Sequence, residues 1–218
     1  HAVATSAAAA PSTPVAASPL RPIGWSKRYS HPSARCGDGA EVGVVRIGDT
    51  RAQAGAAAVR ATRGYQSGVH YLEVHIQTVS DWSYVGFVAS AWGALCLPVG
   101  CAPHSWGVAS NGAVFANGQE LARLPRGYSE GSVVGILLRL ESGLGGCRNA
   151  TFVLDDHRFD NVFKHLPDTL YPAVSNMRAP AAYALVSDLE PPPEEDGGFG
   201  DEEEDEGVGV IDAGVALR

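Results

Sequence analysis

Three acidic and histidine side chains, His70, Glu73 and His75, stand close enough along the chain to suggest a metal site. They fall in a stretch with the period-two pattern of a β-strand, where alternate side chains point to opposite faces. His70 is therefore expected on one face, and Glu73 and His75 on the other. The group also lacks the helical His-Glu-x-x-His spacing of zinc sites. We expect no metal and no cofactor here.

The chain has four cysteines, and none of them forms a Cys-x-x-Cys pair. Four cysteines in 218 residues do not make a disulfide scaffold, so reduced thiols are expected. A bridge between Cys96 and Cys101, within one loop, is the alternative. The four positions are Cys36, Cys96, Cys101 and Cys147.

A hydrolase would need a nucleophile, and Ser105 with His157 and the pair Asp155-Asp156 is the nearest arrangement. No Gly-x-Ser-x-Gly elbow surrounds the serine, and adjacent aspartates are typical of a solvated hairpin turn. The glycine-rich segment 143–146 has neither the lysine nor the following helix of a phosphate-binding loop. The sequence predicts a protein that is not an enzyme.

The residues that organise the chain are 68–89. Leu72, Val74 and Ile76 alternate with polar or aromatic neighbours, as in a strand with one buried face. A nearly continuous apolar run around Gly86 follows, which indicates a strand packed on both faces, with a glycine at a close approach. A turn over Thr78 to Ser83 connects the two strands.

Further strands are expected around Val42 to Ile47, over Ala56 to Thr62 and over Val133 to Leu140, which pairs with Ala150 to Leu154. Arg35 to Gly39 reads as a turn. Asn111-Gly112 predicts a type I′ hairpin turn, because both residue types accept positive φ. Short strands with regular turn signals predict an all-β fold, a two-sheet antiparallel β-sandwich. The expected core residues are Leu72, Val74, Val85, Phe87, Ile136, Leu138 and Phe152.

Composition divides the chain into a patterned body and two biased ends. Residues 1–22 are rich in Ala, Pro and Ser and are expected to form a disordered linker, with order beginning near Ile23 and Trp25. Residues 191–218 are expected to form an acidic disordered tail, since 11 of the 24 acidic residues lie from Glu190 onward. The body carries almost no net charge, which argues against nucleic-acid binding. No apolar run approaches the ~18 residues of a membrane span.

Four blocks of sequence, in order, resemble the SPRY (B30.2-type) domain. They are Gly68-Val-His-Tyr-Leu-Glu-Val74 with the Gly86 strand, then Ser105-Trp-Gly107 with its hairpin, then Glu130 to Val153, and finally Phe159 to Val186. The chain departs from the family pattern at Leu72, Ser132, Arg139 and Asp155-Asp156. The likeness is greatest to SPRY domains of ubiquitin-ligase adaptors. It implies a concanavalin-like jelly roll over residues 23–190.

The resemblance also implies a function. SPRY domains are non-catalytic protein-interaction modules that recognise a short peptide or a partner surface through edge loops, and they recruit substrates to ubiquitin ligases or assemble larger complexes. An intracellular, cytoplasmic location follows from it. The alternative from another class is a lectin-like sandwich that binds carbohydrate, with Trp106, Asn111 and Asn117 as the nearest platform.

The resemblance to SPRY domains implies that the partner-binding residues lie in three loops: the turn before the Gly86 strand, the apolar loop Ser90 to Cys101, and the turn after Tyr171 to Ser175. Tryptophan, methionine and arginine are enriched in interfaces, and here they occur where core packing does not need them. The large apolar groups of the second loop are expected to be partly exposed. The predicted contact residues are Asp81, Trp82, Tyr84, Trp92, Leu95, Leu97, Asn176, Met177 and Arg178.

Overall fold

The computed structural model describes residues 23–50, 55–79, 82–141 and 147–193. The expected linker over residues 1–22 and most of the expected acidic tail lie outside these ranges. Near the start of the described residues, Trp25 is 3% exposed, and its indole Nε1–H donates to the carbonyl of Gly43 at 2.7 Å. None of the described residues belongs to a helix that is long and apolar enough to cross a membrane.

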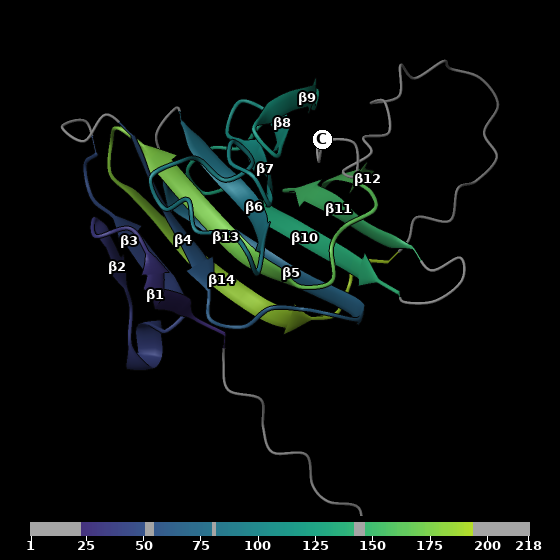
Figure 1. The fold of residues 1–218 in the computed structure, drawn as a ribbon, viewed down its shortest axis with the longest axis horizontal. Helices are drawn as coiled ribbons and strands as arrows, with labels where there is room; N and C mark the ends of the chain where they lie inside the picture. Colours follow the sequence, from purple (N-terminus) through teal and green to yellow (C-terminus); the bar gives the residue numbers. More distant parts are fainter. Residues whose placement is uncertain (1–22, 51–54, 80–81, 142–146, 194–218) are drawn as a thin grey trace, which may run out of the picture.

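Two antiparallel seven-stranded sheets make up the described fold, which confirms the predicted β-sandwich (Figure 1). Sheet A has the order β1-β4-β13-β6-β7-β8-β9, and sheet B has the order β12-β11-β10-β5-β14-β3-β2. The strands are β1 (Trp25–Ser30), β2 (Ala34–Cys36), β3 (Val44–Ile47), β4 (Ala56–Ala61), β5 (Gly68–Thr78), β6 (Ser83–Ala89), β7 (Ser105–Ala109), β8 (Ala113–Ala116), β9 (Gln119–Arg123), β10 (Val133–Leu140), β11 (Arg148–Leu154), β12 (His157–Phe163), β13 (Leu170–Met177) and β14 (Ala181–Leu189).

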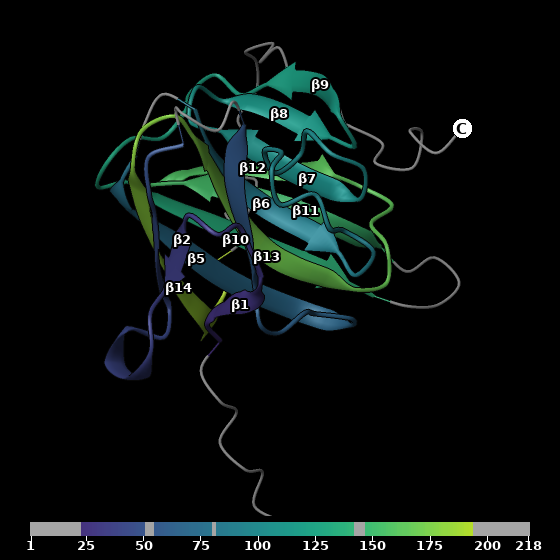
Figure 2. The same cartoon turned by 60° about the vertical axis from the view of Figure 1, so that its left-hand side comes forward.

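The two strands of the organising stretch are present, but they do not pair with each other. β5 lies between β10 and β14 in sheet B, and β6 lies between β13 and β7 in sheet A. The turn between them therefore carries the chain from one sheet to the other. Every residue of β6 is buried, as expected for a strand covered on both faces. Viewed from the side, β8 and β9 continue sheet A away from β6 (Figure 2).

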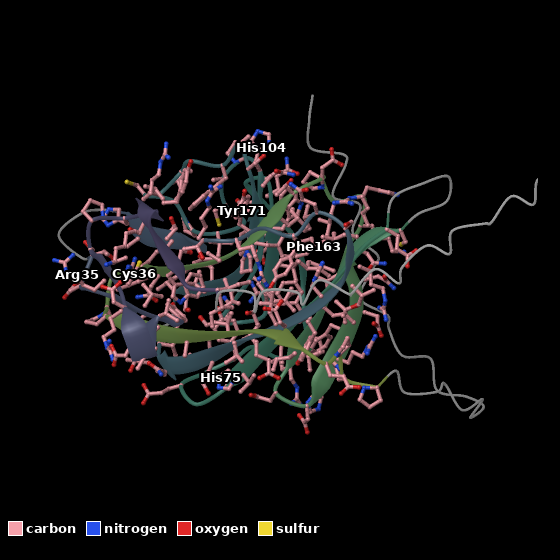
Figure 3. All side chains as sticks on the ribbon, turned by 90° about the horizontal axis from the view of Figure 1, so that it is seen from below. Arg35, Cys36, His75, His104, Phe163 and Tyr171 are labelled. Carbon is pink, nitrogen blue, oxygen red and sulfur yellow. The ribbon has the colours of Figure 1, made fainter. Side chains whose placement is uncertain are left out.

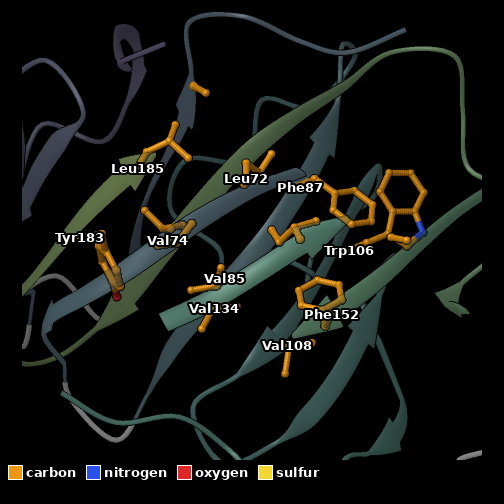
Figure 4. Packing of buried hydrophobic residues seen from close by; sticks show 14 of the residues in the cluster. Leu72, Val74, Val85, Phe87, Trp106, Val108, Val134, Phe152, Tyr183 and Leu185 are labelled. Atoms are coloured by element: carbon orange, nitrogen blue, oxygen red, sulfur yellow. The ribbon is translucent and has the colours of Figure 1, made fainter. Parts of the chain in front are cut away.

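Aromatic rings fill the space between the sheets. Phe87 of β6 lies 5.9 Å from Trp106, 6.3 Å from Phe152 and 5.7 Å from Phe163, measured between ring centroids. Figure 4 shows Phe87, Trp106 and Phe152 beside the aliphatic side chains of β5 and β6. The predicted core is confirmed, because each of its members is at most 1% exposed: Leu72, Val74, Val85, Phe87, Ile136, Leu138 and Phe152.

Glycine at position 86 is explained by a close approach of two backbones. A β-carbon there would lie 2.0 Å from the carbonyl oxygen of Trp106 and 2.6 Å from the α-carbon of Gly107. Gly86 and Gly107 are direct partners in the β6–β7 ladder. Any larger residue at position 86 would push β7 away from β6.

Two turn predictions need correction. Gly112 has φ of 85°, but Asn111 is not among the residues with positive φ, so Asn111-Gly112 is not a type I′ turn. The N–H of Gly112 donates to Ala109, which gives a three-residue connection ending in a left-handed glycine. Asn117 and Gly118, with φ of 51° and 93°, instead form a two-residue turn between β8 and β9. The second correction concerns the expected turn at Arg35 to Gly39, because β2 includes Arg35 and Cys36.

The core analysis leads to a stability prediction for Phe87. Because its side chain is fully buried against three aromatic rings, Phe87→Ala should lower the free energy of unfolding by about 3–5 kcal/mol. Urea denaturation followed by tryptophan fluorescence measures this loss. Leu121→Ala on β9, where the side chain is 37% exposed, is the control and should change stability by less than ~0.5 kcal/mol. A loss under ~1 kcal/mol for Phe87→Ala would contradict the packing described here.

Candidate functional site

The residues that resembled a hydrolase have separate structural roles. Ser105 is completely buried in β7; its hydroxyl donates to the carbonyl of Ala102 at 2.6 Å and accepts the N–H of Gly100 at 3.0 Å. His157 begins β12 at the edge of sheet B and is paired with the exposed Asp156. The serine hydroxyl thus holds a turn in sheet A and has no histidine partner.

The candidate metal ligands are also divided as the strand pattern predicted. Nε2 of His70 lies 2.6 Å from the carbonyl oxygen of Ser67, whereas Nε2 of His75 lies 2.9 Å from Oε2 of Glu73. Within the described ranges, no three His, Cys, Asp or Glu side chains are grouped so that they would hold a metal ion. All four cysteines are free, and burial raises the pKa of Cys101 to about 11, so this thiol is protonated at neutral pH.

The predicted partner-binding residues come from three loops, and the structure brings parts of all three to one end of sheet A. Trp82 is 43% exposed and precedes β6. Its carbonyl accepts the N–H of Met177 at 2.9 Å, and the guanidinium of Arg178 lies 5.7 Å from its ring centroid. Asp81 lies outside the described residues. The turns before β6 and after β13 therefore form one surface.

Thr50 holds Arg178 in place, which sequence reasoning missed. The backbone N–H of Arg178 donates to Oγ1 of Thr50 at 2.7 Å, and its carbonyl accepts the N–H of Thr50 at 2.9 Å. Arg178 has φ of 72°, in the left-handed region that non-glycine residues rarely adopt. Thr50 is 1% exposed, and no sequence pattern links two residues 128 positions apart.

Asn176 does not face a partner, contrary to the prediction. It is completely buried in β13, and its side-chain amide donates to the carbonyls of Met177 and Ala179. These bonds close the turn between β13 and β14. The buried amide of Asn176 thus fixes the backbone of the turn that contains Met177 and Arg178.

The apolar loop Ser90 to Cys101 was expected to expose its large side chains, and this is wrong for Trp92. Trp92 is 2% exposed, and Tyr84 of β6, also predicted to contact a partner, is 4% exposed. Both belong to a second apolar cluster on the outer face of sheet A, which we call the outer cluster. Its buried members are Ala58, Tyr84, Val88, Trp92, Val99, Ala102, Ala109, Ala113 and Ala173.

Leu95 and Leu97, at the middle of this loop, stay accessible. Leu97 is 46% exposed and Leu95 is partly buried. The carbonyls of Leu95 and Cys96 accept N–H groups from Ala58 and Ala56 of β4, at 3.0 and 3.1 Å. Ala56 pairs with Met177 of β13, so the loop reaches the same end of sheet A as Trp82. We call this surface the rim and define it as Trp82, Leu95, Leu97, Met177 and Arg178.

A hollow elsewhere in the described fold contains none of the predicted partner-binding residues. This hollow, of about 620 Å³, is lined by residues of β2, β3 and the start of β14, including Arg35 and Arg46. The guanidinium of Arg46 already forms two hydrogen bonds with the carboxylate of Glu41, at 3.0 and 3.1 Å. Figure 3 shows Arg35 and Cys36 at the end of the molecule where this hollow lies.

The residues suggested for a carbohydrate platform have structural roles that leave them unable to form one. Trp106 is 4% exposed and packs in the core. Oδ1 of Asn111 accepts the N–H of Ala113, and Oδ1 of Asn117 accepts the N–H of His104. An aromatic ring turned into the core offers no stacking surface to a sugar.

Comparison with known proteins gives a match in structure only. No family model matches the sequence, and no curated protein does. The SPRY domain of human HERC1 is similar with a TM-score of 0.62 at 15% identity, covering 77% of this chain and 100% of that domain. The TRIM65 PSpry domain has a TM-score of 0.53 at 17% identity, covering 76% and 92%. A human SPRY domain has a TM-score of 0.53 at 16% identity, covering 74% and 96%.

The chain has the SPRY fold. Identities of 15–17% carry the fold alone, so the function of the rim has to be argued from its own side chains. In this SPRY fold, one face of sheet A packs on the core and the other is covered by the outer cluster. The rim lies at the end of sheet A, next to the outer cluster.

The two loop tryptophans should differ sharply in their effect on stability. Trp92→Ala removes a buried side chain from the outer cluster and should cost about 3–5 kcal/mol. Trp82→Ala removes an exposed side chain and should cost less than ~1 kcal/mol. Thermal unfolding by circular dichroism compares the two variants directly. Equal losses, or a larger loss for Trp82→Ala, would contradict the placement of these rings.

Proposed function

We propose that this chain is a non-catalytic protein-interaction module that binds a short linear segment of a partner protein at the rim. One observation carries the proposal: Trp82 is exposed, yet its backbone and the cation stacked on it are held by hydrogen bonds. Large aromatic and arginine side chains are the commonest hot spots of protein interfaces. The SPRY fold supports the same reading by analogy.

Preorganisation of the rim favours binding. Binding costs little conformational entropy when the receptor is already ordered. Here the N–H of Met177 holds the backbone of Trp82, and Oγ1 of Thr50 holds the backbone of Arg178. Leu95 and Leu97 add apolar surface across the end of β4 and β13. The combination of one stacked cation, one exposed indole and two leucines suits an extended peptide with apolar side chains.

The resemblance to SPRY domains of ubiquitin-ligase adaptors supports a more specific role. The peptide would then belong to a substrate that the module recruits to a ligase, or to a subunit of a larger complex. Proximity labelling with the wild-type chain and with Trp82→Ala, compared quantitatively, separates rim-dependent neighbours from background. Rim-dependent enrichment of ligase subunits together with a common second protein supports recruitment. Enrichment of one stoichiometric complex that lacks any ligase supports assembly instead.

Binding energy should be concentrated in Trp82 and Arg178. A display library of random peptides, selected on the full chain and counter-selected on a Trp82→Ala/Arg178→Ala double variant, supplies the ligand. Each single substitution should then weaken the selected peptide by about 2 kcal/mol, or about 30-fold in Kd, measured by fluorescence anisotropy. Melting temperatures should stay nearly unchanged.

Two exposed residues away from the rim provide matched controls. Val69→Ala on β5 and Leu121→Ala on β9 remove side chains that are 48% and 37% exposed, and they should leave Kd within about twofold. Peptide affinity that is indifferent to Trp82→Ala and Arg178→Ala, or that falls equally in the controls, would rule out the rim as the site.

A further inference from the structure

An arginine on β4, the second strand from one edge of sheet A, is buried without an anion. Arg60 of β4 is 6% exposed, and its guanidinium carbon lies 3.6 Å from the ring centroid of Tyr29 and 4.0 Å from that of Tyr171. β4 lies between β1 and β13, so the two rings flank the guanidinium from opposite sides. The next outward residue along β4, Ala58, belongs to the outer cluster, which places Arg60 on the same outer face.

The hydrogen-bond donors of Arg60 are unused. Nε and Nη1 are enclosed and have no hydrogen-bond partner within the described ranges, and no carboxylate there forms an ion pair with Arg60. The third nitrogen, Nη2, is not enclosed in this way. Stacking on two rings offsets part of the cost of desolvating a cation, but it satisfies none of its N–H groups. The group therefore lacks an acceptor, and a negatively charged acceptor would suit it best.

The rings of Tyr29 and Tyr171 lie beside the guanidinium of Arg60, toward the surface of the molecule. Tyr29 and Tyr171 are only partly buried, and Gly64 makes room for Tyr171, since a β-carbon at Gly64 would lie 2.9 Å from that ring. Figure 3 shows Tyr171 on the opposite side of the sandwich from His75, which lies on sheet B. A carboxylate would reach the guanidinium at Nη2, the nitrogen that is not enclosed. Arg28, 5.4 Å from the Tyr29 ring, adds positive charge nearby.

Arg60 lies on the strand, β4, that two rim residues contact. Leu95 contacts β4 at Ala58, two residues from Arg60, and Met177 pairs with Ala56, four residues from it. At ~3.3 Å per residue, Arg60 lies about 13 Å along β4 from the Met177 end of the sheet. Trp82 precedes β6, two strands away from β4, which adds roughly 10 Å across the sheet, so an extended peptide would span the resulting ~16 Å with about five residues.

We propose that Arg60, between Tyr29 and Tyr171, binds an aspartate or glutamate carboxylate of the partner peptide, about five residues from the group that contacts Trp82. This inference rests on the proposed function and names the class of its ligand: a peptide with an apolar anchor and an acidic side chain at a fixed spacing. The chain's own acidic segment, residues 194–206, is the competing occupant to be tested.

The test uses the peptides selected on the full chain. We expect an acidic residue at one position in most of them, and an Asp→Asn copy of the best peptide should bind about tenfold more weakly to the wild-type chain. Arg60→Met should bind the two copies equally, with the affinity of the Asn copy little changed. Arg60→Lys, which keeps the charge but loses the planar fork, should retain only part of the preference. The comparison of the Asp and Asn peptides uses only the wild-type protein, so it remains valid even if an Arg60 variant does not fold.

The outcomes separate this inference from the proposed function. If selected peptides depend on Trp82 but show no acidic preference, or keep that preference in Arg60→Met, the carboxylate site is wrong and the rim stands. If selection yields no peptide that depends on Trp82, both are wrong. A synthetic peptide of residues 194–206 that displaces the selected peptide from the wild-type chain but not from Arg60→Met would assign the site to the chain's own tail and overturn a partner carboxylate.

Discussion

The arrangement of the molecule depends on how closely the loop Ser90 to Cys101 lies on sheet A. Small residues on the outer face make this approach possible: a β-carbon at Gly107 would lie 3.0 Å from the carbonyl oxygen of Val99, and Ala58 and Ala173 offer little bulk beneath the loop. The central strands of sheet A are therefore buried on both faces, which is unusual for an antiparallel sheet that would normally leave one face to water. The part of sheet A beneath the outer cluster is closed to a partner, and the rim lies at the end of the sheet.

Three backbone contacts then give the rim its shape. Trp82 bonds to Met177, Met177 pairs with Ala56, and Ala56 bonds to Cys96, so the three loops are tied through the backbone of sheet A. A site built this way changes little on binding, because its positions are set by ladder hydrogen bonds rather than by the loops themselves. The same rigidity explains how Arg178 keeps a left-handed backbone with help from buried Thr50.

Strand periodicity predicted the core well and the site only in part. Leu72, Val74 and Phe87 follow alternation, which local sequence encodes directly. Tyr84 and Trp92 were misplaced because a loop that folds back over a sheet leaves no period in the sequence, and Asn176 because its buried amide closes the turn between β13 and β14. The Thr50–Arg178 bond and the stacked Arg60 join residues far apart in the chain, so only the tertiary fold reveals them.

The central claim is that a partner peptide lies across the rim at the end of sheet A. Chemical-shift mapping of the ¹⁵N-labelled full chain, titrated with a selected peptide, tests it most directly. The account predicts that the largest shifts fall on Trp82, including its indole N–H, and on Leu95, Leu97, Met177 and Arg178. Shifts centred instead on the outer face of sheet B, around Glu73, His75 and Val186, would contradict it.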